Sequence, residues 1–384
     1  MAWDWLKRQF STGTPDRAKT PAVAWPAVAW IDAADNSWGV PVLNVQPVTQ
    51  GTLSASLDSR CATNALSFSG DDGTSFLGVE PTSARRLPIQ LRYRVDRLLA
   101  DGVLFLPRQM EHKWAIFYRG GRIVFVRSWL RQVVAVAVAQ VVGDFLEVTE
   151  LSGTLTTEDE SPEQAVRTLD FLIRTHALQV GHPAPLPPGL ADNPKQAGLW
   201  CMSCFGNVAH FATPHPVAVD VPDQVLRSNS LLHIAVACGD KAQVRSLAAA
   251  GMPLDLPAQD GLPPLHWALA RPDTAMLGLV IACGSPVDVR SLEGATALMG
   301  AAQGRSFEKT AFLLDRGADP NAADGRGFTA LHRAAEMGEV AIAELLLDRG
   351  AFAHSEAQGH TPRSLAIFRD ATAVVALLDS RSVP

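Results

Sequence analysis

The chain has 384 residues, of which 47% are hydrophobic and 19% charged, and its formal net charge is −6. This length accommodates two or three domains with sizeable cores, and so mild a negative charge gives no general attraction for nucleic acid. The five cysteines are odd in number and follow no disulfide framework, which indicates a reducing compartment.

The sequence also lacks the features of an exported or membrane-spanning chain. The longest apolar run, Val133–Val142, is interrupted by Gln140 and is far too short to cross a bilayer. The first residues contain no uninterrupted apolar core of the kind found in secretory signals. We therefore expect a cytoplasmic protein without a membrane segment, and delivery by a signal-free secretion system is the alternative.

Residues 1–30 are expected to form an N-terminal arm. Its distinguishing feature is a small duplication, in which Pro-Ala-Val-Ala-Trp occurs twice between Pro21 and Trp30. We interpret the arm as a docking segment whose tryptophans lie on the surface of the following domain. A recognition motif is the alternative interpretation.

Residues 31–180 carry the pattern of an α+β domain. Pro88–Asp96 alternates apolar and polar residues with a period of two, which predicts a half-buried strand. Lys113–Tyr118 and Arg122–Trp129 flank Gly120-Gly121 and predict a hairpin with a primed turn. Val133–Val142 and Phe145–Leu151 predict two more strands, so we expect a mostly antiparallel sheet.

One helix is expected to pack on this sheet. Ser161 followed by Pro162 is a strong helix start, because serine caps the free N–H groups and proline fits the first turn. Gln164 stands at the return position of a capping box. The apolar residues that follow have helical spacing to about His176, so the segment predicts a helix on the sheet.

Residues 181–227 are expected to form a proline-rich connection, because His182-Pro-Ala-Pro-Leu-Pro-Pro is typical of a stiff surface segment. Within it, Leu199–Thr213 alternates like a pair of strands that returns to the N-terminal sheet. The connection then leads into residues 228–384, which contain an internal repeat.

The repeat has a period of 33 residues over most of its length. Two markers recur at this step. One is a glycine, at Gly251, Gly284, Gly317 and Gly350, and the other is the series His233, His266, Met299 and His332. A period in this range is typical of stacked-repeat proteins, in which each unit is too small to bury a core alone and packs on its neighbours. Pro263, Pro272 and a glycine shifted to Gly304 make the second and third copies the least regular.

The fullest copy runs from Asp324 to Gly350-Ala351 and contains Gly327-Phe-Thr-Ala-Leu-His-Arg-Ala-Ala. This stretch resembles the ankyrin repeat, whose core pattern is Gly-x-Thr-Pro-Leu-His-x-Ala. The resemblance covers about residues 228–383 in about five copies, and residues 1–220 resemble no known family. It implies a turn finger and two antiparallel helices per copy, with the motif histidines bracing the turn. The overall expectation is thus a multidomain α+β protein that ends in an all-α ankyrin stack.

Ankyrin stacks carry partners on a concave groove and on the finger tips, so the resemblance implies that this chain binds a partner protein of unknown identity. Trp267 and Arg333 are the expected anchors, because large aromatic residues and arginine dominate binding hot spots. The full expected set comprises Trp267 and Arg333, the first-helix ends Arg271, Gln303, Glu336 and Met337, and the finger residues Asp260, Arg326 and Phe328. The alternative for Trp267 is that it packs on a neighbouring repeat or on the N-terminal domain.

The N-terminal half contains two further candidate sites. Residues 85–131 hold eleven basic and three acidic residues with interleaved aromatics, a composition that fits an anion or nucleic acid. These arginines could equally meet the acidic stretch Asp144–Glu163. Cys61 with His112 and Asp71 is a weak candidate for a nucleophilic set, and the Asp71-Asp72 pair is a turn rather than a metal ligand in the favoured interpretation.

The second candidate is a weak metal site formed by Cys201, Cys204, His210 and His215. The separation between Cys204 and His210 is much shorter than in common zinc fingers, so no metal is expected. No motif points to a cofactor or to a class of reaction. The expected function is therefore protein binding, and the alternative is an enzyme or effector whose N-terminal domain is targeted or regulated by the repeats.

Overall fold

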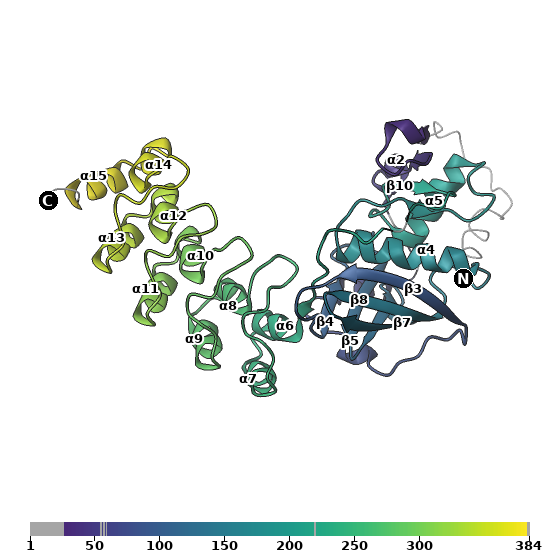
Figure 1. Cartoon of the computed structure of the whole chain (residues 1–384), viewed down its shortest axis with the longest axis horizontal. Coiled ribbons are helices and arrows are strands. Elements are labelled where there is room, and N and C mark those ends of the chain that lie inside the picture. Colours follow the sequence, from purple (N-terminus) through teal and green to yellow (C-terminus); the bar gives the residue numbers. More distant parts are fainter. Residues whose placement is uncertain (1–26, 54–55, 57, 59, 219, 382–384) are drawn as a thin grey trace. The chain divides into compact units, whose positions relative to one another are not determined.

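The computed structural model describes residues 27–381 apart from 54–55, 57, 59 and 219, so nearly all of the expected N-terminal arm lies outside it. The chain divides into two compact units, Met1–Ser228 and Asn229–Pro384. The first is a mostly antiparallel sheet with packed helices, and the second is built of helix pairs (Figure 1). The predicted multidomain α+β fold is therefore confirmed.

The larger sheet of the first unit is antiparallel, and its strands follow the spatial order β4-β5-β6-β7-β8-β3. Gly120 and Gly121 both have positive φ, as the predicted primed turn between the second and third of these strands requires. The predicted strands are thus confirmed, with the bounds β3 (Arg86–Arg94), β5 (Trp114–Arg119), β6 (Arg122–Arg127), β7 (Gln132–Val142) and β8 (Phe145–Gly153). Strand β4 (Gly102–Phe105) was not predicted.

Helix α4 (Pro162–Leu172) lies over one face of this sheet (Figure 1). It begins as predicted, because the Ser161 side chain accepts a hydrogen bond from the backbone of Gln164. The Gln164 side chain does not close a capping box and instead donates to the carbonyl of Pro185 at 2.7 Å. A π-helical turn, η3 (Ile173–Ala177), extends the helix. Leu169, Leu172 and Ile173 join the sheet residues in one buried core.

The prediction of a strand pair over Leu199–Thr213 is wrong for its first half. Residues Pro194–Phe205 form helix α5, and only Phe211–Thr213 is a strand, β10. The Asn193 side chain accepts a hydrogen bond from the backbone of Gln196, and Pro194 occupies the first turn. The helix buries Trp200, Cys201, Cys204 and Phe205, whose spacing is helical.

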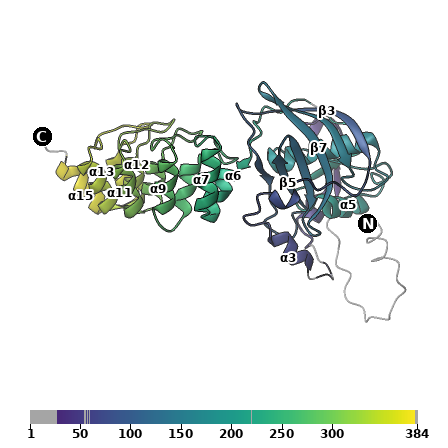
Figure 2. The same ribbon diagram turned by 90° about the horizontal axis from the view of Figure 1, so that it is seen from below.

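The remaining elements of the first unit include a small second sheet with the order β1-β2-β10-β9. Helix α3 lies below the larger sheet in the view of Figure 2. Phe68, which follows α3, and Phe76 of η2 contact the Phe117 ring of the larger sheet. Their bounds are β1 (Ala29–Ile31), η1 (Ala33–Asp35), β2 (Val42–Asn44), α2 (Gln46–Thr49), α3 (Arg60–Leu66), η2 (Thr74–Phe76) and β9 (Ala184–Pro185).

The second unit is a row of helix pairs, each preceded by a tight turn (Figure 1). First helices stack on first helices and second helices on second helices. After β11 (Asn229–Ser230), the described pairs are α6 (Leu231–Cys238) with α7 (Lys241–Ala249), α8 (Pro264–Trp267) and η4 (Ala268–Ala270) with α9 (Ala275–Ala282), α10 (Ala297–Gln303) with α11 (Phe307–Asp315), α12 (Ala330–Met337) with α13 (Val340–Asp348), and α14 (Pro362–Phe368) with α15 (Thr372–Arg381).

The stacking core repeats with the sequence period. In each of the first four copies, one leucine is fully buried or nearly so at the 33-residue step: Leu232, Leu265, Leu298 and Leu331. A buried small residue follows three positions later in each of these four copies and lets the helices approach closely: Ala235, Ala268, Ala301 and Ala334. Because these side chains face neighbouring copies, one elongated core runs through the unit.

The irregular copies differ at the turn between their two helices. Gly239 and Gly338 end their first helices in the left-handed conformation. Gly304 does not take this role, because its φ is −76°, and Arg305 adopts a positive φ of 57° instead. In the copy with Pro272, the first helix tightens into η4 and the chain becomes extended at Arg271. Proline cannot adopt a positive φ, so this turn differs as expected.

Candidate interaction surface

The motif histidines brace one copy against the next, which confirms their predicted structural role. In the fourth copy, the Thr329 N–H donates to His332 Nδ1 at 3.1 Å, so that nitrogen accepts and the ring proton lies on Nε2. His332 Nε2 then donates to the carbonyl of His360 in the next finger at 3.3 Å. His233 and His266 make the same contact with Leu262 and Ala295, at 3.1 and 3.0 Å.

The turn before each first helix, called the finger below, is a short hairpin closed by backbone hydrogen bonds. Asp324 N–H donates to the carbonyl of Phe328 at 2.9 Å, and the equivalent bonds close the other fingers. Adjacent fingers are also joined, because Leu292 N–H donates to Gly261 and Gly325 N–H donates to Glu293, at 3.0 and 2.8 Å. The fingers of copies two to four therefore form one continuous, pre-organised edge.

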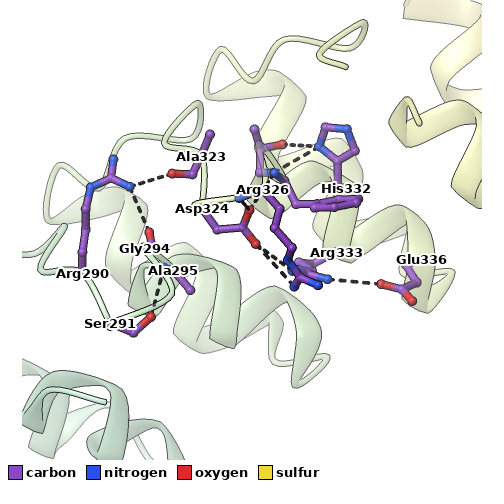
Figure 3. Close-up of polar contacts among 12 residues, drawn as sticks. Arg290, Ser291, Gly294, Ala295, Ala323, Asp324, Arg326, His332, Arg333 and Glu336 are labelled. Atoms are coloured by element: carbon purple, nitrogen blue, oxygen red, sulfur yellow. Dashed lines mark hydrogen bonds and ion pairs between the residues drawn. The ribbon is translucent and has the colours of Figure 1, made fainter. Parts of the chain in front are cut away.

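The fourth finger contains the most elaborate side-chain cluster of this edge (Figure 3). Asp324 is 97% buried at its side chain, the remaining 3% being exposed, and its Oδ1 accepts the N–H groups of Arg326 and Phe328, both at 2.9 Å. Its Oδ2 accepts from Arg333 at 2.9 Å and lies 3.8 Å from Arg326. Both guanidinium groups lie beside the Phe328 ring, 5.5 and 5.1 Å from its centroid. One buried carboxylate thus positions two arginines around an aromatic ring.

The cluster continues into the fifth copy through Glu336. Its carboxylate lies 3.5 Å from Arg333 and accepts from Arg369 at 2.8 Å. The hydrogen bond from Arg369 lowers the pKa of Glu336 below its ordinary value, so this carboxylate is charged at neutral pH. Three arginines therefore share two carboxylates, which leaves an excess of positive charge at this end of the surface.

The other predicted surface residues are spread along the same side of the stack. Trp267 is half-buried, stacks edge-on against His233 at 5.1 Å and donates its indole N–H to Asp260 at 3.0 Å. Arg271 donates to the carbonyl of Ala237 at 2.9 Å, at the end of the neighbouring first helix. Gln303 is exposed, and its side chain makes no hydrogen bond with any described residue. The structure thus engages Trp267 within the stack, packing it on the preceding copy.

Met337, the last residue of the predicted set, is half-buried at the end of α12, and its carbonyl accepts from Arg305 at 3.1 Å. Two residues of the observed cluster are absent from the predicted set. Asp324 was identifiable as the start of the fullest copy, where an aspartate followed by glycine favours a turn that its own carboxylate closes. Arg369 lies one repeat step beyond the end of α12, but its contact with Glu336 depends on how two copies stack.

The candidate sites of the first unit are not assembled in the same way. Six basic side chains of residues 85–131 pair with carboxylates, at N–O distances of 2.6–3.9 Å: Arg85 with Glu160, Arg86 with Glu150, Arg92 with Glu147, Arg119 with Asp101, Arg122 with Glu80 and Arg131 with Asp71. Three of these carboxylates belong to the acidic stretch 144–163. The interpretation that the basic residues meet that stretch is confirmed for Arg85, Arg86 and Arg92.

The candidate residues for a nucleophilic set and for a metal site are engaged in other contacts or buried. Asp71 pairs with Arg131, whereas His112 accepts from the backbone of Arg108 at 3.1 Å. Burial raises the pKa of the Cys201 thiol well above its ordinary value and that of Cys204 to about 12, so both thiols stay protonated. Within the described residues, no group of three or more His, Cys, Asp or Glu side chains is placed to hold a metal ion.

The remaining candidates are held in the connection that follows α5. His210 faces the Gln50 side chain at 3.1 Å, and the carbonyl of His215 accepts from Arg167 at 2.6 Å. None of the helices in the described part of the chain is long and apolar enough to cross a membrane.

A row of helix pairs, joined by fingers and braced from one copy to the next, defines a repeat protein. Residues 272–357 match the family model of ankyrin repeats over three copies, so this part of the chain consists of ankyrin repeats. No curated protein matches the sequence. Ankyrin repeats support a role in protein–protein interaction in general.

Proposed function

We propose that the chain binds a partner protein through the finger tips and first-helix ends of its repeats, with Arg326, Phe328, Arg333 and Glu336 at the centre. The observation that carries the proposal is the cluster of the fourth finger, where a buried carboxylate holds two arginines against an aromatic ring. Side chains fixed before binding lose little conformational entropy on contact, which favours affinity.

The stacking core does not account for the exposed part of this cluster. The Arg326 side chain is 54% exposed, and its strongest described polar contact is a long ion pair of 3.8 Å. Arginine and aromatic residues are enriched at the energetic centres of interfaces. Met337 adds to the proposed surface in the same copy, and Asp260, Trp267, Arg271 and Gln303 extend it over the neighbouring copies.

Site-specific photo-crosslinking of the full chain tests this proposal. A photoreactive residue is placed at Gln303, which is exposed and makes no described hydrogen bond, and separately at Arg245 on the second helix of the first copy, which is also exposed. We expect partner adducts from position 303 and none from position 245. Competition by unlabelled chain should remove them, and competition by the Arg326→Glu and Arg333→Glu variant should not. Equal adducts from both positions would contradict a binding surface on this side.

A further inference from the structure

We propose that the finger tips orient the bound partner by charge, so that one end of the surface takes a cation and the other an anion; this inference rests on the proposed function. The tip residue of each finger recurs at the 33-residue step and is Asp260 in copy two, Glu293 in copy three and Arg326 in copy four. We call these three residues the tip row. Its sign changes from negative to positive along the stack.

The spacing of the tip row is fixed by the hydrogen bonds between fingers. Each finger is a short hairpin closed by a backbone hydrogen bond, and adjacent fingers are bonded directly through the Leu292 and Gly325 N–H groups. Hydrogen-bonded strands lie about 4.8 Å apart, so successive tips are spaced by about two strand separations, or ~9.5 Å. Gly294 permits this approach, since it has a φ of +81° and an added Cβ would lie 2.8 Å from Gly325 N.

The tip charges are available to a partner. Asp260 and Glu293 are exposed, and Glu293 makes no ion pair or side-chain hydrogen bond with any described residue. Asp260 accepts hydrogen bonds from the Leu262 N–H and the Trp267 indole N–H. At the opposite end, Arg326 lies in a cluster with Arg333 and Arg369. These three arginines outnumber the two carboxylates that they share. The charge of the tip residue therefore changes sign between the third and fourth fingers.

An extended segment of a partner protein fits this pattern. Such a segment advances about 3.3 Å per residue, so about three residues span one finger and about six span two. The structure then selects a segment with Lys or Arg facing Asp260 and Glu293, and Asp or Glu about three to six residues away facing Arg326. Leu292 is 56% exposed between the charged tips and offers an apolar contact to the intervening residues.

Nucleic acid fits the surface poorly. A polyanion would place like charges against Asp260 and Glu293, and residues 229–384 as a whole carry seventeen acidic residues against thirteen basic ones. A uniformly acidic protein segment meets the same repulsion at the first two tips. Mixed charge in a defined order is therefore the property that distinguishes the predicted partner.

Selection from a phage-displayed library of random short peptides on the immobilised full chain tests the inference. The row-inverted variant carries Asp260→Lys, Glu293→Lys and Arg326→Glu. A control variant carries Glu308→Lys, Glu344→Lys and Arg316→Glu, which change the net charge equally at exposed positions on second helices. We expect the wild type and the control to enrich peptides whose basic and acidic residues follow one order along the peptide. We expect the row-inverted variant to enrich peptides with the reverse order.

The expected preference between the two orders is roughly tenfold, because three exposed ion pairs change sign together, and high salt should reduce it. If all three proteins enrich peptides with the same order of charges, or if only acidic peptides are enriched, the charge inference is overturned. The proposed binding of a partner by the repeats would still stand. If the wild type enriches no peptides, the proposed function fails and the inference fails with it.

Discussion

The fourth repeat contains a hydrogen-bonded pair of a threonine and a histidine. The third repeat keeps only the threonine of this pair, and the second keeps only the histidine. In the fourth, the Thr329 hydroxyl faces His332 Nδ1 at 2.9 Å. The third repeat keeps the threonine as Thr296, but Met299 replaces the histidine, and the fully buried hydroxyl has no hydrogen-bond partner in the described part of the chain. In the second, Pro263 replaces the threonine, and His266 Nδ1 is left without a partner there.

Replacing each threonine by valine should therefore have opposite effects on stability. Thr329→Val removes a hydrogen bond while Nδ1 keeps the backbone donor, so we expect a loss of about 1 kcal/mol. Thr296→Val removes a buried hydroxyl that has no partner and makes no helix-capping bond, and relieves a desolvation cost of about 1–3 kcal/mol. The free energies of unfolding of the two variants should differ by about 2 kcal/mol or more.

Hydrogen exchange of the full chain, followed by mass spectrometry, measures these effects at the helix that follows each threonine. We expect slower exchange over α10 in Thr296→Val and faster exchange over α12 in Thr329→Val, with matching shifts in urea unfolding. Met299→His should stabilise when Thr296 is present and less so in the Thr296→Val background, with a coupling of about 1 kcal/mol. Equal destabilisation by both valine substitutions would refute the argument that Thr296 lacks a partner.

Three further predictions concern stability. Arg305→Gly should stabilise by about 1 kcal/mol in urea unfolding, since glycine relieves the positive φ of 57° and the exposed contacts that are lost contribute little; a clear loss would contradict this. Burial raises the pKa of Asp288, whereas Asn321 at the same position of the next repeat accepts from Phe352 and donates to the carbonyl of Gly350, both at 2.8 Å. Asp288→Asn should therefore stabilise by about 1 kcal/mol at pH 7 and less in acid, where the wild-type carboxyl is neutral, and an equal gain at both pH values would count against it. Burial lowers the pKa of His176 to about 3 and that of His182 to about 4, so the unfolded chain gains protons below pH 6.5 that the native chain does not. Stability should fall on acidification by up to about 1.4 kcal/mol per pH unit for each histidine, less so in His176→Phe, and urea midpoints that are equal at pH 7 and 5 would exclude this.

The elements that could be predicted from the sequence are those specified by local signals. The hairpin at Gly120-Gly121 combines a turn that needs positive φ with alternating strands, and α4 begins at a capping serine followed by proline. Leu199–Phe205 was misassigned because a short apolar run fits a strand and a buried helix equally well. Asn193 followed by Pro194 was the signal that decides for the helix.

The candidate surface was predictable only in part. The sequence period determines which residues lie at the tips, whereas the contacts between repeats depend on how the repeats stack. The repeat period identifies which positions lie at the tips, and Arg326, Phe328 and Arg333 were found in this way. The pairing of Glu336 with Arg369 joins different repeats, so it depends on the stacking geometry rather than on local pattern. The ion pairs of Arg85, Arg86 and Arg92 likewise depend on the strand register between β3 and β8 and the turn beyond it.

The internal repeats also separate the positions that stack from those free to carry specificity. Leucine recurs at positions 232, 265, 298 and 331, and each of these side chains is buried against a neighbouring copy. Close packing therefore restricts these positions to a side chain of one size and shape. The tips change from aspartate to glutamate to arginine in the same unit, because solvent on one side imposes no packing requirement. A change of sign there costs the fold little while it reverses the local potential. Selectivity for a partner can therefore be altered at the tips without weakening the stack that holds them.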